Sequence, residues 1–274
     1  MLSHITGSTK IYGLVGDPLK SAKSPALMNK IFAERLSDSV CIPFEVSADR
    51  LDEFVKGARS IHNLAGVLVT MPHKQRMIGI VDELHPTARQ IGAVNVIRCE
   101  TDGRWVGAVF DGLGFVLGLQ REGVSLADKS VLLIGAGGAG RAIAFAVASA
   151  GARSLAISDV TPSRAEDLAR SVEMEARYSP SSGQVDPAGY DIVINATPLG
   201  MNPDDPMPAD ASKLDPGTVV VDIITRPEPT PFLLGAQSRG CSTLDGGPMH
   251  MGQALLALQF LGFEDIEDGA WAAS

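Results

Sequence analysis

An apolar run that breaks into regularly spaced glycines is the feature that most constrains how this chain can fold. Val131–Ile134 is followed by Gly135-Ala-Gly137-Gly-Ala-Gly140 and then by an alanine-rich segment. Glycines spaced G-x-G-x-x-G, after a strand and before a helix, are typical of a dinucleotide-binding βαβ unit. The first glycine makes a tight turn, the second lets the backbone approach a pyrophosphate, and the third lets helix and strand pack closely. The alternative is an ordinary tight turn that binds nothing.

The next predicted strand supports the nucleotide-binding interpretation. Ser154–Ser158 is apolar enough for a strand, and Asp159 follows it, about 20 residues after Gly140. An acidic side chain at this distance accepts hydrogen bonds from the adenosine ribose and repels the 2′-phosphate of NADP. Arg164 is the one cation close by in the sequence, and an acidic neighbour on the following helix is an alternative partner for it. The sequence therefore predicts NAD(P) as the cofactor, with a preference for NAD over NADP.

We expect the cofactor to contact the glycine-rich turn and the acidic residue, which together comprise Gly135, Ala136, Gly137, Gly138, Ala139, Gly140 and Asp159.

Length, charge and cysteine content narrow the class of protein further. With 274 residues the chain is long enough for two domains, and its net charge of −9 argues against nucleic acid or membranes as partners. Its three cysteines, Cys41, Cys99 and Cys241, are far apart and form no C-x-x-C pair. Neither a disulfide framework nor a metal site is therefore predicted. Because no signal-peptide pattern and no apolar run of membrane-spanning length occur, we expect a cytoplasmic protein.

Strand and helix patterns alternate in two blocks, which predicts an α/β protein with two domains. We expect a substrate-binding α/β domain over residues 1–110 and a Rossmann-type doubly wound parallel sheet over 111–244. The C-terminal helices, 245–274, are expected to pack back on the first domain. In the first block we predict a largely parallel sheet and a helix over residues 74–81.

Short motifs in a fixed order give the chain a resemblance to the shikimate/quinate dehydrogenase family. The resemblance covers nearly the whole chain, from Tyr12 to Phe260. Its motifs are Gly16-Asp-Pro-Leu, Lys23-Ser-Pro25, Val69-Thr-Met-Pro-His-Lys74, Gly92-Ala-Val-Asn95, Asp111-Gly112, the glycine-rich turn, Asn195-Ala-Thr-Pro-Leu-Gly-Met201, Thr230-Pro231, Asp245-Gly246 and Gln253. The resemblance implies an NAD(P)-dependent dehydrogenase that interconverts a ring hydroxyl and a ketone of a cyclic hydroxy acid.

Two of these residues are chemically suited to alcohol oxidation. A lysine beside a carboxylate can hydrogen-bond the reacting oxygen and take up its proton. Lys74 and Asp111 match the catalytic lysine and aspartate of the family. Without the resemblance, a surface lysine and a helix-capping aspartate would be the favoured explanation, and the resemblance reverses that preference.

The resemblance also implies the other site residues. The substrate is expected to contact Ser24, Thr70, Asn95 and Gln253. The cofactor is expected to lie against Asn195, Ala196, Thr197, Ile223 and Gly246.

Departures from the family pattern fall at the expected substrate site. Ala22 stands where the family has the first of two carboxylate-binding serines, and Thr225 stands in place of a tyrosine. Leu68 and the pair Val109-Phe110 are apolar where the family is polar. Arg226 offers a guanidinium that could bind a substrate carboxylate in compensation, or it is a solvated loop cation. Both interpretations of Arg226 stay open.

Three functions fit these observations. The first is oxidation of a shikimate- or quinate-like acid, and the second is the same chemistry on a less hydroxylated ring acid, favoured by the apolar replacements. The third is a non-catalytic nucleotide-binding regulatory module, which the retention of Lys74 and Asp111 disfavours. For the oligomeric state we expect a monomer or a homodimer.

Overall fold

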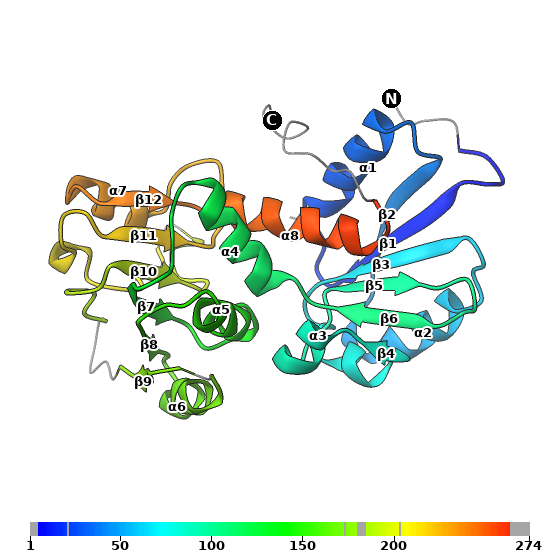
Figure 1. The fold of residues 1–274 in the computed structure, drawn as a ribbon. Helices are drawn as coiled ribbons and strands as arrows, with labels where there is room; N and C mark the ends of the chain where they lie inside the picture. The colour runs from blue at the N-terminus through cyan, green and yellow to red at the C-terminus, as the bar shows by residue number, and fades with distance from the viewer. Residues whose placement is uncertain (1–4, 21, 173, 180–184, 203, 264–274) are drawn as a thin grey trace. The chain divides into compact units, whose positions relative to one another are not determined.

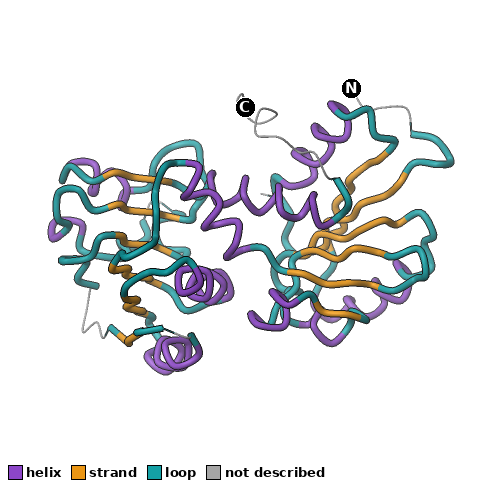
Figure 2. The backbone as a smooth tube through the Cα atoms, in the orientation of Figure 1, coloured by secondary structure: helices purple, strands orange, loops and turns teal. Residues whose placement is uncertain are grey.

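The computed structural model describes residues 5–20, 22–172, 174–179, 185–202 and 204–263. The chain forms two compact units, each with its own sheet (Figures 1 and 2). The first unit takes in residues 1–110 and 254–274, and the second takes in residues 111–253. The chain therefore first passes between the units at Phe110–Asp111.

The first unit contains a mixed sheet with the strand order β2-β1-β3-β5-β6-β4. Its strands are β1 (Lys10–Gly16), β2 (Ser39–Glu45), β3 (Leu64–Val69), β4 (Glu83–Leu84), β5 (Val96–Cys99) and β6 (Trp105–Ala108). β1 pairs in parallel with β2 and β3, but β5 is antiparallel to both of its neighbours, β3 and β6. The sheet is nevertheless largely parallel, as expected, because the pairings β1–β2, β1–β3 and β4–β6 are parallel and only the two pairings of β5 are antiparallel. β5 and β6 are antiparallel because the turn that joins them is short, and a connection of this length can join only antiparallel strands.

Short helices pack around this sheet. They are α1 (Ser24–Glu34), η1 (Ala48–Arg50), α2 (Leu51–Ala58), η2 (Arg76–Gly79) and α3 (Pro86–Ile91). The helix expected over residues 74–81 is wrong, since only the 3₁₀ turn η2 forms there. The carbonyl of Lys74 accepts a hydrogen bond from Val94 N (2.8 Å) instead of from a helical neighbour. The sequence patterns do not predict α3, although His85 caps it through Nδ1 and Gly92 ends it in the left-handed conformation.

The second unit contains a parallel sheet with the order β12-β11-β10-β7-β8-β9. Its strands are β7 (Ser130–Ile134), β8 (Ser154–Ser158), β9 (Ala176–Tyr178), β10 (Ile192–Asn195), β11 (Val219–Asp222) and β12 (Ser242–Leu244). Counted along the chain this is the order 3-2-1-4-5-6 of the doubly wound dinucleotide-binding fold. The order reverses between β7 and β10, and dinucleotides bind outside the carboxyl ends of the strands at such a reversal.

Helices cover this second sheet and complete the fold. They are α4 (Asp111–Arg121), α5 (Gly138–Ser149), α6 (Pro162–Ser171), η3 (Ala211–Lys213), α7 (Pro231–Ser238) and α8 (Gly247–Phe260). α5 and α6 pack against strands on the β7–β9 side, and α7 packs against β11 and β12 (Figure 1).

The second passage between the units lies inside α8, between Gln253 and Ala254. The first half of α8 belongs to the second unit because its backbone packs tightly on α4. A Cβ atom on Gly118 of α4 would lie 2.5 Å from the carbonyl oxygen of Pro248 in α8.

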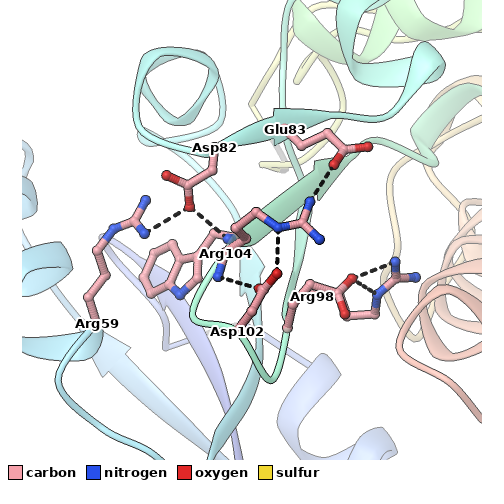
Figure 3. A network of polar contacts seen from close by, with 8 residues as sticks. Arg59, Asp82, Glu83, Arg98, Asp102 and Arg104 are labelled. Carbon is pink, nitrogen blue, oxygen red and sulfur yellow. Dashed lines mark hydrogen bonds and ion pairs between the residues drawn. The ribbon is translucent and has the colours of Figure 1, made fainter.

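Charged side chains gather at the end of the first sheet where β5 turns into β6 (Figure 3). The Asp82 carboxylate accepts hydrogen bonds from Arg59 Nη1 (2.9 Å) and from Trp105 N (2.7 Å), and the arginine bond holds the pKa of Asp82 below its ordinary value. Arg104 contacts Asp102 and Glu83. Pairs as exposed as these contribute at most about 1 kcal/mol each to stability. The network lies at the opposite end of β5 from Asn95, so we interpret it as structural.

Candidate functional site

Two predicted substrate residues of the first unit, and the loop of the predicted catalytic lysine, lie at one edge of its sheet. Thr70 follows β3, and its N–H donates to Val15 O at the end of β1 (3.0 Å). Asn95 precedes β5, which runs antiparallel to β3, and its carbonyl accepts from Val69 N (2.8 Å). Because the amide next to Asn95 donates to the carbonyl of Lys74, the Lys74 loop is held at the same edge.

The loop that carries Lys74 is anchored by the residue before it, for which the motifs predicted no role. His73 is fully buried, and its Nε2 bonds the carbonyl of Val46, just after β2, at 2.7 Å. Since a carbonyl only accepts, Nε2 carries the proton. Arg76 bonds the Ala48 carbonyl and the Asp52 carboxylate nearby. Together these contacts tie the segment that carries Lys74 to the end of β2.

Ser24, the predicted carboxylate contact, is the first residue of α1. Lys23 is the N-cap residue of this helix, and its side chain accepts no hydrogen bond from the first amides of the helix. Such amides and the helix dipole favour an anion. Ala22, in place of a serine, is half-buried beside this helix start.

The apolar pair Val109-Phe110 lies in the core of the first unit. The two side chains are only 3% and 6% exposed, and the Phe110 ring packs against His85 and Phe260 with centroids 6.0 and 5.7 Å away. Both side chains therefore pack within the first unit, and their place at or beside the substrate site stays a prediction. The backbone of Phe110 does contribute, because its N–H donates to Asn95 Oδ1 (3.2 Å) and so orients that amide. Leu68, on β3, is half-buried.

The glycine-rich turn of the second unit has the shape that its spacing predicts. Gly135 has φ +105°, which favours glycine, and a Cβ on Gly140 would lie 1.9 Å from Gly135 O. Gly137 and Gly138 are exposed, and a Cβ added to either would have no atom within 4 Å. The protein's own backbone therefore leaves no room for a side chain at Gly140, whereas Gly137 borders open space that can hold a ligand.

Asp159 lies directly against this turn. Its carboxylate accepts from Ala136 N (2.7 Å) and from Thr161 N (2.8 Å). A carboxylate has about four acceptor positions, so it can accept from a ribose as well. Val160 beside it is 93% exposed. Among the described residues Arg164 has no ion pair, and Asp167, a neighbour that could have bound it, pairs with Arg170.

Asn195 belongs to a buried polar network at the ends of β10 and β11. Its Nδ2 donates to Asp222 Oδ1 (3.0 Å) and to Leu199 O (3.2 Å), while its Oδ1 accepts from the Thr197 hydroxyl (2.6 Å). Thr230 donates to the other Asp222 oxygen (2.7 Å). Burial raises the pKa of Asp222. The Asn195 side chain therefore holds the loop after β10, and its amide is engaged within the protein.

Other predicted cofactor contacts lie in pairs where two backbones approach closely. A Cβ on Gly246 would lie 2.2 Å from Ile223 O, and a Cβ on Gly135 would lie 2.8 Å from Ala196 O. Arg226 is half-buried, and its Nη1 donates to the carbonyl of Gly200 (3.2 Å). Arg226 therefore binds the loop after β10 through one nitrogen of its charged guanidinium group.

Asp111 and Gln253 meet in the second unit. Asp111 begins α4, is 4% exposed, and accepts a hydrogen bond through Oδ1 from Gln253 Nε2 (3.0 Å). Gln253 is half-buried and lies in the first half of α8. The sequence motifs named both residues but gave no sign that they touch, because 142 positions separate them.

Within the described ranges, no three His, Cys, Asp or Glu side chains gather as metal ligands. None of the helices described is long and apolar enough to cross a membrane.

The fold and the glycine-rich turn define a dinucleotide-binding protein with a second α/β unit. Residues 14–97 match the family model for the shikimate dehydrogenase substrate binding domain, and residues 118–202 match the model for shikimate / quinate 5-dehydrogenase. A shikimate dehydrogenase (NADP(+)) of Desulforamulus reducens is 41% identical over 93% of this chain and 90% of its own length. This chain belongs to the shikimate dehydrogenase family.

Two solved structures illustrate the range of that likeness. Quinate dehydrogenase from Corynebacterium glutamicum in complex with NAD is 29% identical, with a TM-score of 0.85 over 92% of this chain and 93% of that one. The 5-ketofructose reductase of Gluconobacter sp. strain CHM43 is 33% identical, with a TM-score of 0.84 over 92% of both chains. The chain is therefore similar both to enzymes named for cyclic acids and to one named for a sugar ketone.

Proposed function

We propose that this protein interconverts a ring hydroxyl and a ketone of a shikimate- or quinate-like cyclic hydroxy acid, with NAD as the preferred cofactor. The observation that carries the proposal is that each unit contains one half of the chemistry. Lys74, Thr70 and Asn95 lie at one sheet edge of the first unit, with Ser24 at the start of α1. The second unit supplies the glycine-rich turn and the Asp111–Gln253 pair.

In the proposed reaction the substrate alcohol loses a hydride and a proton. The bound nicotinamide supplies the hydride acceptor. Lys74 and Asp111 hydrogen-bond the reacting oxygen and take its proton, so that the C–O bond becomes a carbonyl. Asn95, Thr70 and Gln253 orient the other hydroxyls, and Ser24 with the start of α1 binds the carboxylate.

The preference for NAD follows from charge around the adenosine end. Asp159 presents a carboxylate beside the turn, and its exposed neighbour Val160 adds no positive charge. A 2′-phosphate would meet this carboxylate at close range, which disfavours NADP. The quinate dehydrogenase bound to NAD supports this choice, whereas the relative from Desulforamulus reducens is named for NADP(+). Exposed Arg164 is the cation that would support the opposite preference.

A second substrate class is a polyhydroxylated ketone without a carboxylate. Ala22 and Thr225 have replaced two residues that bind an acid in the family, and Arg226 is partly engaged with Gly200. The likeness to 5-ketofructose reductase favours this candidate. The alternative of a less hydroxylated ring acid loses support, because Val109 and Phe110 pack in the core.

The test is a panel of shikimate, quinate and 5-ketofructose with NAD(H) and NADP(H), followed by nicotinamide absorbance. We expect turnover of a cyclic acid, fastest with NAD, and a loss of roughly 10²–10⁴-fold in Lys74→Ala with unchanged binding of NAD. If that variant keeps more than about a tenth of wild-type kcat, Lys74 does not have this role. If 5-ketofructose alone is reduced, the second class is correct. No turnover of any member would favour a nucleotide-binding regulatory module.

Restoring the family's acid-binding residues separates the two substrate classes. Ala22→Ser with Thr225→Tyr should improve shikimate turnover if the natural substrate is an acid held by a weakened site. If the site is shaped for another molecule, the double variant should not turn over shikimate faster. A cytoplasmic location and a monomeric or homodimeric state remain predictions, and the latter can be measured by sedimentation.

A further inference from the structure

We propose that Gln253 is a positioning residue for Asp111, holding the carboxylate in the orientation needed for proton transfer in addition to contacting substrate. This inference rests on the proposed role of Asp111. It starts from the 3.0 Å hydrogen bond that Gln253 Nε2 donates to Asp111 Oδ1. A bond between an amide and a carboxylate is charge-assisted and therefore stronger than a bond between neutral groups.

Gln253 is held beside Asp111 because the backbones of α4 and α8 are in contact. A Cβ on Gly114 of α4 would lie 2.5 Å from Gln253 N and 2.6 Å from its Cγ. A Cβ on Gly252 would lie 2.2 Å from the Gly114 carbonyl oxygen. No side chain larger than hydrogen fits at either position, so α4 and α8 touch backbone to backbone where Asp111 and Gln253 meet.

The other side of α4 is held as tightly. A Cβ on Gly112, the residue after Asp111, would lie 2.2 Å from the carbonyl oxygen of Ala142 in α5. α5 is the helix that follows the glycine-rich turn. The backbone of Asp111 is thus fixed between α5 and α8. The orientation of its side chain is set by rotation about χ1 and χ2, and the Gln253 bond contributes to fixing that orientation.

The consequence is that loss of the Gln253 donor acts through Asp111. Asp111 is 4% exposed, so little water is available to replace the donor. If Gln253 only contacted the substrate, removing its donor would mainly raise KM. If it acts through Asp111, removing the donor lowers kcat, and only when residue 111 carries a carboxylate.

The test is a double-mutant cycle with Gln253→Met and Asp111→Asn, with kcat and KM measured for the substrate found in the panel. Methionine keeps the length of the side chain against Gly114 but cannot donate. We expect Gln253→Met to lower kcat roughly 10–100-fold in the wild type and less than about twofold in the Asp111→Asn background. Gln120→Met on the exposed face of α4 is the matched control and should change neither constant.

A second variant distinguishes loss of the hydrogen-bond donor from misfolding. Gln253→Glu has nearly the same shape, and while the two adjacent carboxyls share one proton the new carboxyl can donate as the amide does. Its kcat should therefore rise as the pH is lowered through the first protonation of the pair and fall again when Asp111 is protonated as well. NAD binding to each variant reports that the second unit is folded. An equal loss of kcat in both backgrounds, or a change in KM alone, overturns the inference. Near-normal turnover by Asp111→Asn alone would instead refute the proposed role of Asp111.

Discussion

Alanine substitutions at neighbouring glycines of the glycine-rich turn should affect stability differently, because the space around each glycine differs. In Gly140→Ala the new methyl group would lie 1.9 Å from the backbone oxygen of Gly135, and a backbone oxygen cannot rotate away. Overpacking of this kind costs about 1–3 kcal/mol. For a chain of this size each kcal/mol lowers Tm by roughly 2–4 °C. We therefore expect a less stable protein with a distorted turn and weakened NAD binding.

Gly137→Ala and Gly138→Ala are the matched comparisons, since nothing lies within 4 Å of either added methyl group. Both variants should keep the wild-type Tm. Gly137→Ala should still lose NAD affinity, because the methyl group stands where the pyrophosphate approaches. Thermal unfolding by circular dichroism and NAD titration by calorimetry measure the two effects separately. A wild-type Tm in Gly140→Ala, or an equal drop in all three variants, would refute the steric argument.

Three other predictions follow from single contacts. Asp159→Asn should lower the NAD-to-NADP ratio of kcat/KM roughly tenfold or more, because the charge that repels the 2′-phosphate is lost; a wild-type preference for NADP would contradict this and point to Arg164. Arg226→Ala should raise KM for a carboxylate substrate roughly 10–100-fold, whereas an unchanged KM would leave Arg226 with only its Gly200 contact. Burial raises the pKa of the Cys41 and Cys99 thiols to about 12, so both should react with Ellman's reagent at pH 8 only after unfolding; rapid labelling of the folded protein would show that these sites are open.

The cofactor half of the protein could be predicted from sequence because its constraints are local. Only glycine tolerates the φ of Gly135 and the close approach at Gly140, and both needs arise within six residues. Asp159 follows at a distance set by one helix and one strand. Lys74, Asn95 and Asp111 could be named because each sits in a short motif. None of these steps required knowing which strands are neighbours.

Tertiary structure decided what these residues touch. The sequence motifs place Phe110 at the substrate site, but packing against His85 and Phe260 puts its ring in the core. The motifs place Asn195 at the cofactor, yet its amide is used by a network that exists only because β10 and β11 are paired. The Gln253–Asp111 bond depends on two helices crossing at glycines far apart along the chain. Short-range sterics can be inferred from neighbouring residues, whereas contacts between distant segments depend on strand order and helix packing, which the whole chain determines at once.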